Sequence, residues 1–160
     1  MIAVATEPNV VLHLASGPRR PARPKTRRGD GAQGRQPRLK VLIVEDELFA
    51  ALHVESVLQH LGYEVAGIAA NRATAVKAFQ TERPDIVLMD INLGSGPDGL
   101  AVAEEIRDLG DTDIVFVTAY DDPRTESRIE ARLPGCAIVS KPVTPEVLGH
   151  VLIRSATKRH

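Results

Sequence analysis

A single carboxylate, Asp90, stands at the end of a short apolar run that begins at Val87. The run follows a proline, and a brief apolar segment with that boundary predicts a buried central strand. The glycine-rich segment 93–99 follows soon after, so the strand is expected to end at Asp90. Open α/β folds place their sites at the carboxyl ends of strands, which makes Asp90 a candidate nucleophile. Taken alone, an aspartate in such a place more often starts a turn.

Three other segments of the chain also end in polar residues. Glu45 and Asp46 follow one apolar segment, Thr118 ends a second, and Lys141 follows a third. If all these segments are parallel strands, their carboxyl ends lie at the same edge of the sheet as Asp90. Four separate parts of the sequence would then bring polar side chains to one place.

The chemistry of these side chains is complementary. Three carboxylates at one edge repel one another and raise one another's pKa, and a divalent cation removes that conflict. Oxygen ligands without His or Cys indicate Mg²⁺. Lys141 supplies a point charge suited to phosphate, and Thr118 supplies a hydroxyl donor. A carboxylate nucleophile, Mg²⁺, a lysine and a hydroxyl are what phosphoryl transfer requires.

The elements that must position these residues alternate between strand and helix. The expected strands are 40–44, 63–69, 87–90, 113–117 and 136–139. Helices are expected over 47–61, after the N-cap Asn71, after Asp98, over 124–132 and after the N-cap Thr144. Five strands alternating with five helices predict an α/β fold with a parallel sheet and right-handed crossovers.

Apolar residues at helical spacing predict which helix faces point toward the sheet. The predicted inward residues are Ala51, Val54, Leu58 and Leu61 in the first helix, Ala73, Val76 and Phe79 in the second, Val102, Ala103, Ile106 and Leu109 in the third, and Leu148, Val151 and Leu152 in the last. Aromatic residues make up only 3% of the chain, so the core must be aliphatic.

Charge divides the chain into two parts. The net charge of −1 over 160 residues conceals a basic segment, since residues 1–40 carry nine Lys or Arg and two acidic residues. The remainder is acidic, with a net charge of −8. Residues 1–38 are rich in Pro, Arg and Gly and show no sustained period, so a disordered N-terminal tail is predicted there. The following residues, 39–156, form the predicted domain.

Composition also excludes several classes of protein. The single cysteine, Cys136, permits no internal disulfide, which fits a reducing, cytoplasmic location. No apolar run approaches membrane-spanning length, and a secretory signal is not indicated. The five histidines are scattered, and although His53 and His60 share a helix face, no third metal ligand accompanies them. Cys136 is interpreted as a small buried hydrophobe.

The polar strand ends carry a family resemblance. The segments 44–47 (Val-Glu-Asp-Glu), 89–92 (Met-Asp-Ile-Asn), 117–119 (Val-Thr-Ala) and 140–142 (Ser-Lys-Pro), in this order and at these separations, resemble the receiver domain of two-component response regulators. The resemblance covers about residues 39–155 and is closest to the stand-alone, single-domain type. It implies a flavodoxin-like, doubly wound (βα)5 three-layer sandwich with strand order 2-1-3-4-5.

The same resemblance implies roles for individual residues. Asp90 would be the phospho-acceptor, and Thr118 and Lys141 would bind the phosphoryl oxygens. Mg²⁺ would be held by Asp46 and Asp90, with Glu45 helping through water and the Asn92 carbonyl as a further ligand. The Lys141–Pro142 peptide bond is usually cis in such domains.

The sequence departs from the usual receiver pattern at three places. Many receivers carry an aromatic residue three positions before the lysine, where this chain has Ile138. The nearest aromatic residue at the mouth of the site is Tyr120. The loop between Asp90 and Gly99 is about one residue longer than usual, with Gly94 where proline is common. These departures put the usual aromatic switch in doubt, but not the acceptor chemistry.

The sequence therefore predicts a phospho-acceptor that signals through protein contacts. The implied donor is a sensor histidine kinase or a histidine phosphotransfer protein, and the implied output is a downstream protein target. Such a domain is a signalling switch that catalyses its own phosphorylation and dephosphorylation, rather than a metabolic enzyme.

Two alternatives stay open at this point. A nucleic-acid-binding regulator could act through the basic tail, although residues 1–38 contain no Phe, Tyr or Trp to stack on bases. A phosphatase with an aspartate nucleophile would need an acidic partner two residues after Asp90, where Asn92 stands.

Overall fold

The structure is a computed structural model that describes residues 3–4, 10–12, 38–94, 98–119 and 123–157. The strands are β1 (Ala3–Val4), β2 (Val10–Leu12), β3 (Lys40–Val44), β4 (Glu64–Ala69), β5 (Ile86–Asp90), β6 (Asp113–Thr118) and β7 (Ala137–Ser140). The helices are α1 (Leu48–His60), α2 (Arg72–Glu82), α3 (Gly99–Leu109), α4 (Pro123–Arg132) and α5 (Pro145–Thr157).

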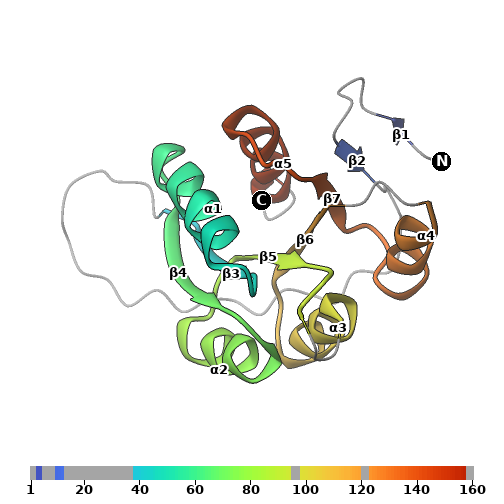
Figure 1. The fold of residues 1–160 in the computed structure, drawn as a ribbon, viewed down its shortest axis with the longest axis horizontal. Helices are drawn as coiled ribbons and strands as arrows, with labels where there is room; N and C mark the ends of the chain where they lie inside the picture. The colour runs from blue at the N-terminus through green and yellow to red at the C-terminus, as the bar shows by residue number, and fades with distance from the viewer. Residues whose placement is uncertain (1–2, 5–9, 13–37, 95–97, 120–122, 158–160) are drawn as a thin grey trace.

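One sheet organises these elements (Figure 1). Its order is β1-β2-β7-β6-β5-β3-β4, and the five strands β3, β4, β5, β6 and β7 are parallel to one another. Numbered among themselves, these five follow the predicted order 2-1-3-4-5, so the predicted flavodoxin-like α/β fold is confirmed. β5 is the middle strand of these five and is buried along its whole length. Asp90 is therefore the last residue of the central strand.

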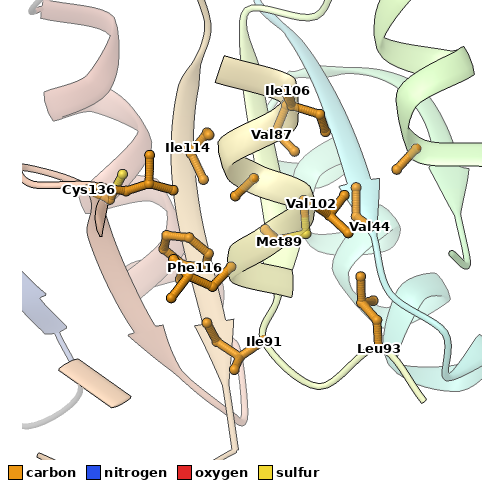
Figure 2. Packing of buried hydrophobic residues seen from close by; sticks show 14 of the residues in the cluster. Val44, Val87, Met89, Ile91, Leu93, Val102, Ile106, Ile114, Phe116 and Cys136 are labelled. Atoms are coloured by element: carbon orange, nitrogen blue, oxygen red, sulfur yellow. The ribbon is translucent and has the colours of Figure 1, made fainter. Parts of the chain in front are cut away.

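Helices cover both faces of the sheet. Helices α1 and α5 pack on one face, against β3, β5, β6 and β7 residues that include Ile43, Leu88 and Val115. Helices α2, α3 and α4 pack on the other face. Figure 2 shows part of that second core, where Met89 of β5 and Phe116 of β6 lie against α3, which carries Val102 and Ile106. The three layers hold the strand ends at a fixed spacing.

Short-range signals set where the helices begin. The Asn71 side chain accepts a hydrogen bond from Thr74 N–H, and the Thr74 hydroxyl accepts one from Asn71 N–H, which completes a capping box. The Asp98 side chain accepts from Ala101 N–H at the start of α3. Thr144 accepts from Val147 N–H, with Pro145 as the first residue of α5. The predicted N-caps Asn71 and Thr144 are confirmed, and Asp98 caps α3 in the same way.

Two predicted inward residues are wrong. Ala73 is exposed, and Ala75 takes its place in the core beside Phe79. Leu109 is the last residue of α3 and is 40% exposed, although Ile106 in the same turn is fully buried. Ala75 lies four residues before Phe79 and therefore on the same helix face, whereas Ala73 lies six residues before it and faces away.

Two short strands lie within the segment predicted to be a disordered N-terminal tail. β1 and β2 pair with each other antiparallel, and β2 pairs antiparallel with β7. The physical reason is that β7 is the last strand of the parallel sheet, and its outer edge offers unpaired backbone groups. The apolar, β-branched stretch Val10–Leu12 suits that edge. The rest of 1–37 lies outside the described residues.

Candidate functional site

The predicted site residues converge at the carboxyl edge of the sheet. Glu45 follows β3, Asp90 ends β5, and one oxygen from each of Glu45, Asp46 and Asp90 lies within 4.8 Å of the others. Thr118 ends β6, and Lys141 follows β7. The parallel register aligns these ends, since Asp90 pairs with Val117 and Thr118 pairs with Ser140.

Asp90 is held firmly at the centre. It is 5% exposed, and its two carboxylate oxygens have different partners. Oδ1 accepts a hydrogen bond from Asn92 N–H at 2.9 Å, and Oδ2 accepts one from Lys141 Nζ at 3.0 Å. These contacts fix the orientation of the carboxylate and leave it at the floor of the cluster.

Lys141 bridges two of the acidic residues. Its Nζ donates to Glu45 Oε2 at 2.7 Å as well as to Asp90. Its backbone N–H donates to the carbonyl oxygen of Thr118 at 2.8 Å, which ties β6 to the residue that follows β7. The Lys141–Pro142 peptide bond is cis, as expected. Thr118 is 3% exposed, so its hydroxyl lies inside this edge and not on the open surface.

Glu45 and Asp46 differ in their surroundings. Glu45 is buried, and its Oε1 accepts from Glu47 N–H at 3.0 Å while Oε2 binds Lys141. Asp46 is exposed at the rim. Gly94 approaches Asp46 so closely that a Cβ added to Gly94 would lie 2.8 Å from Asp46 Oδ2. The loop after β5 therefore forms one wall around Asp46.

The pKa values of Glu45 and Lys141 are both raised, but for different reasons. Burial is the largest influence on Glu45 and raises the pKa of its carboxyl above the usual value, although hydrogen bonds from Lys141 and Glu47 oppose it. Burial would lower the pKa of Lys141, but its hydrogen bonds to Glu45 and Asp90 raise it above the usual value. Burial therefore raises the pKa of Glu45, whereas the two neighbouring carboxylates raise that of Lys141.

This donor set fits Mg²⁺. The three carboxylates are hard oxygen ligands, they converge without His or Cys, and their excess charge would be neutralised by a divalent cation. No other cluster of three possible ligands occurs in the part of the chain that the structure describes. His53 instead shares a hydrogen bond with the Val143 carbonyl through Nε2 at 2.8 Å.

Several features of the site were not predicted from the sequence. No sequence pattern predicts the hydrogen bond from Asn92 N–H to Asp90 or the close approach of Gly94 to Asp46. Gly94 has a φ of 54°, in the left-handed region, which explains why glycine and not proline stands there. Tyr120, considered above as the aromatic residue at the mouth, lies outside the described residues.

Most of the described chain matches a known protein family. The response regulator receiver domain family matches residues 41–153. This chain belongs to that family. The match spans β3 to α5 and includes every residue of the cluster.

Relatives and solved structures agree with this assignment. The chain is 36% identical over 84 residues to the phyllosphere-induced regulator PhyR of Methylorubrum extorquens, covering 52% of this chain and 32% of the relative. It is 33% identical over 125 residues to the probable transcriptional regulator ycf27 of Cyanophora paradoxa, covering 75% and 48%. The receiver domain of Erythrobacter litoralis PhyR superimposes with a TM-score of 0.66 at 30% identity, covering 75% of this chain and 91% of that one.

The receiver chain spans about a third to a half of the length of these curated relatives. The comparisons do not favour the alternative of a nucleic-acid-binding regulator acting through the basic tail. Within the described residues, no helix of this receiver combines the length and apolar character needed to cross a membrane.

Proposed function

We propose that this receiver is a cytoplasmic phospho-acceptor of a two-component or phosphorelay system, with Asp90 as the residue that takes the phosphoryl group. The observation that carries the proposal is the position of Asp90. It ends the central strand, its carboxylate is oriented by two hydrogen bonds, and it lies within a cluster of acidic residues and one lysine.

The donor in this proposal is a phosphohistidine of a sensor histidine kinase or a histidine phosphotransfer protein. A carboxylate oxygen of Asp90 forms a bond to phosphorus while the bond from phosphorus to the imidazole nitrogen breaks. The imidazole keeps the electron pair and binds a proton. The product is an aspartyl phosphate, and hydrolysis later restores the carboxylate.

The other residues of the cluster neutralise and orient charge. Lys141 already binds Asp90, and its mobile ammonium would move to an oxygen of the phosphoryl group. Thr118, at the neighbouring strand end, would donate its hydroxyl to another. The carboxylates of Asp46 and Asp90 and the carbonyl of Asn92 would hold Mg²⁺, with Glu45 helping through water, and the ion would supply charge neutralisation to the transferring group.

An apolar surface beside the site suits a protein donor. Leu48, Phe49 and Leu52 of α1 are 63%, 80% and 44% exposed, and α1 begins two residues after Asp46. A protein that brings a phosphohistidine to Asp90 must cover this rim, and exposed apolar side chains there would be buried by it. Output would follow through contact with a downstream protein. In the solved structure from Bartonella quintana, the relative PhyR is described as an anti-anti-sigma factor.

Phosphorylation by a small donor tests the acceptor role without the partner. The full chain is incubated with acetyl phosphate and Mg²⁺, and its intact mass is measured. We expect the mass of one phosphoryl group to be added, and Asp90→Asn to abolish the addition because an amide is a poor nucleophile. The matched control is Asp111→Asn, an exposed residue outside the cluster, which should be labelled like the wild type. Equal labelling of Asp90→Asn and wild type would show that Asp90 is not the acceptor.

A further inference from the structure

The outer edge of β7 is the place where the parallel sheet stops. One side of β7 pairs with β6, and the backbone groups on its other side would be open in a sheet that ended there. In this receiver that side is paired antiparallel with β2, in the register Val10 with Val139, Val11 with Ile138 and Leu12 with Ala137. β1 lies outside β2, and Figure 1 shows both strands beyond β7.

The composition of β2 suits this pairing. Val10–Leu12 is a run of apolar residues, two of them β-branched, and such residues favour a strand. Residues 3–4 add only a short second strand. An isolated two-stranded hairpin is marginal in water, so β1 and β2 depend on β7 for part of their hydrogen bonding.

We propose that the outer edge of β7 is a strand-binding site, and that β2 of the same chain, with β1 on its outer side, occupies this edge as a tethered cover. The cover excludes other extended segments from this edge, including those of a second copy of the chain. It also gives the N-terminal segment a role that its basic composition does not suggest.

The tether favours pairing within one chain. Residues 13–37 join β2 to Arg38 and could extend over about 80 Å if fully stretched, which is more than enough to reach β7 from the start of β3. Two binding segments joined within one chain meet each other at an effective concentration of about millimolar. A second copy at ordinary protein concentration competes poorly against that. The contact is also small, with three residue pairs, so another strand that binds more strongly could displace the cover.

The cover lies on the strand that leads into the acidic cluster. β2 pairs with β7 up to Val139, and Ser140 and Lys141 follow directly. The backbone N–H of Lys141 binds Thr118, and its ammonium binds Asp90. A shift of β7 that accompanies binding or release of the cover would therefore reach Lys141 within two residues, and any change at Lys141 would reach the cover.

Disulfide trapping tests the pairing and its register. In a full-length Cys136→Ala background, which removes the native thiol, Leu12→Cys is combined with Ala137→Cys, and oxidised glutathione accepts the two electrons and protons. We expect a disulfide within one chain, seen as a monomer on a non-reducing gel and as the loss of two hydrogens from the intact mass. The matched control pairs Val4→Cys with Ala137→Cys, because β1 is separated from β7 by β2 and these residues should not cross-link efficiently. Cross-links found only between chains, or equal cross-linking of the two pairs, would overturn the proposal.

Hydrogen exchange gives a second readout that needs no cysteine. Val11→Pro removes a backbone donor from β2 and should release the cover, so the amides of Ala137–Val139 that face β2 should exchange about tenfold faster. Ala32→Pro, outside both strands, is the control for adding a proline to the same segment and should leave exchange unchanged. If Val11→Pro leaves the protection of these amides as in the wild type, β2 does not cover the edge. Neither readout depends on phosphorylation, so the outcome is separate from that of the proposed function.

Discussion

At the scale of single residues, the site is a balance between three carboxylates and one lysine. Lys141 donates hydrogen bonds to both Glu45 and Asp90, whereas Asp46 is exposed and lies outside this pair of hydrogen bonds. Removing a carboxylate should therefore have opposite effects with and without a divalent cation, because the same charge that repels its neighbours also binds the ion.

Asp46→Ala tests this balance. Without Mg²⁺ and at low salt, we expect the variant to be more stable than the wild type by up to about 1 kcal/mol, since one repelling charge is gone. Mg²⁺ should raise the melting temperature of the wild type and leave that of the variant nearly unchanged. Thermal melts with Mg²⁺ and with EDTA measure both effects. Glu47→Ala, an exposed acidic neighbour outside the cluster, should keep the response. If Asp46→Ala responds to Mg²⁺ as the wild type does, Asp46 is not a ligand.

Much of this site could be predicted from the sequence, because its members are side chains at strand ends. A polar residue at or just after the end of an apolar segment indicates both where a site residue lies and which functional group it offers, as for Asp90 and Lys141. Contacts made by the backbone could not be predicted in this way. The N–H of Asn92 reaches Asp90, and Gly94 reaches Asp46, only because the loop folds back over the sheet edge.

Asp98 has two functions that can be separated by mutation. It caps α3 through Ala101 N–H, and it forms an ion pair with Arg128 of α4. Asp98→Asn keeps a good cap but loses the ion pair, so a loss of at most about 1 kcal/mol is expected. Asp98→Ala loses the cap as well, for about 1 kcal/mol more. Urea unfolding of both variants measures the difference.

The pH dependence of Asp98 has a definite sign. Burial raises the pKa of its carboxyl, but the hydrogen bonds from Ala101 and Arg128 outweigh burial and lower the pKa below its usual value of 3.8. The unfolded chain therefore binds this proton more readily than the folded one. The stability advantage of the wild type over the Asp98→Asn variant should be complete above pH 3.8 and lost as the pH falls through the folded pKa. A difference that grows on acidification would contradict this account.

At the scale of elements, α4 is fastened to α3. Arg128 pairs with Asp98, Arg132 pairs with Glu104, and Ile129 is fully buried. The short polar sequence of α4 predicts a marginal helix in isolation, so these tertiary contacts supply what the sequence lacks. Ile138 is also buried, at 3% exposure. The surface formed by α4 and β7 is thus held by ion pairs and an aliphatic core.

The start of α3 is packed against the acceptor residue itself. A Cβ added to Gly99 would lie 1.8 Å from the backbone oxygen of Asp90, and Gly99 N–H donates to the Ile91 carbonyl at 2.8 Å. Because the obstacle is backbone, Gly99→Ala must move α3 or the end of β5. We expect it to destabilise the protein by about 1–3 kcal/mol and to slow phosphorylation of the folded fraction.

Gly149→Ala provides the matched control for this substitution. Gly149 lies within α5, and an added Cβ would meet Leu61 at 3.4 Å, an ordinary contact. Alanine there should stabilise the helix by about 0.5–1 kcal/mol and leave phosphorylation unchanged. Urea unfolding and intact mass measure both variants. If Gly99→Ala proves as harmless as Gly149→Ala, Gly99 does not pack closely against the backbone of Asp90.

At this scale the alternation of strand and helix predicted a parallel α/β sheet, while the strand order 2-1-3-4-5 came from the resemblance to receiver domains. Caps such as Asn71 and Thr144 located helix starts to within a residue. The outer strands β1 and β2 escaped prediction, since their pairing depends on the edge of β7, more than a hundred residues away in the sequence. A local pattern cannot record such a partner.

At the scale of the whole molecule, the receiver presents distinct surfaces for distinct tasks. The acidic cluster lies at one edge of the sheet, the apolar residues Leu48, Phe49 and Leu52 lie at the start of α1 beside it, and β2 covers β7 at the end of the sheet. A phosphoryl donor and a downstream protein could therefore contact different parts of the molecule. Phosphorylation of Asp90 could then change the binding of both proteins.

The central claim is that Asp90 receives the phosphoryl group, and chemical mapping of the acyl phosphate tests it most directly. The full chain is phosphorylated with acetyl phosphate and Mg²⁺, and borohydride then reduces the aspartyl phosphate to homoserine, which peptide mass spectrometry locates. We predict homoserine at position 90, dependent on Mg²⁺, with Asp46 and Glu45 unmodified. Homoserine at position 46 with none at 90, or no conversion under conditions where the intact chain gains a phosphoryl group, would contradict the account.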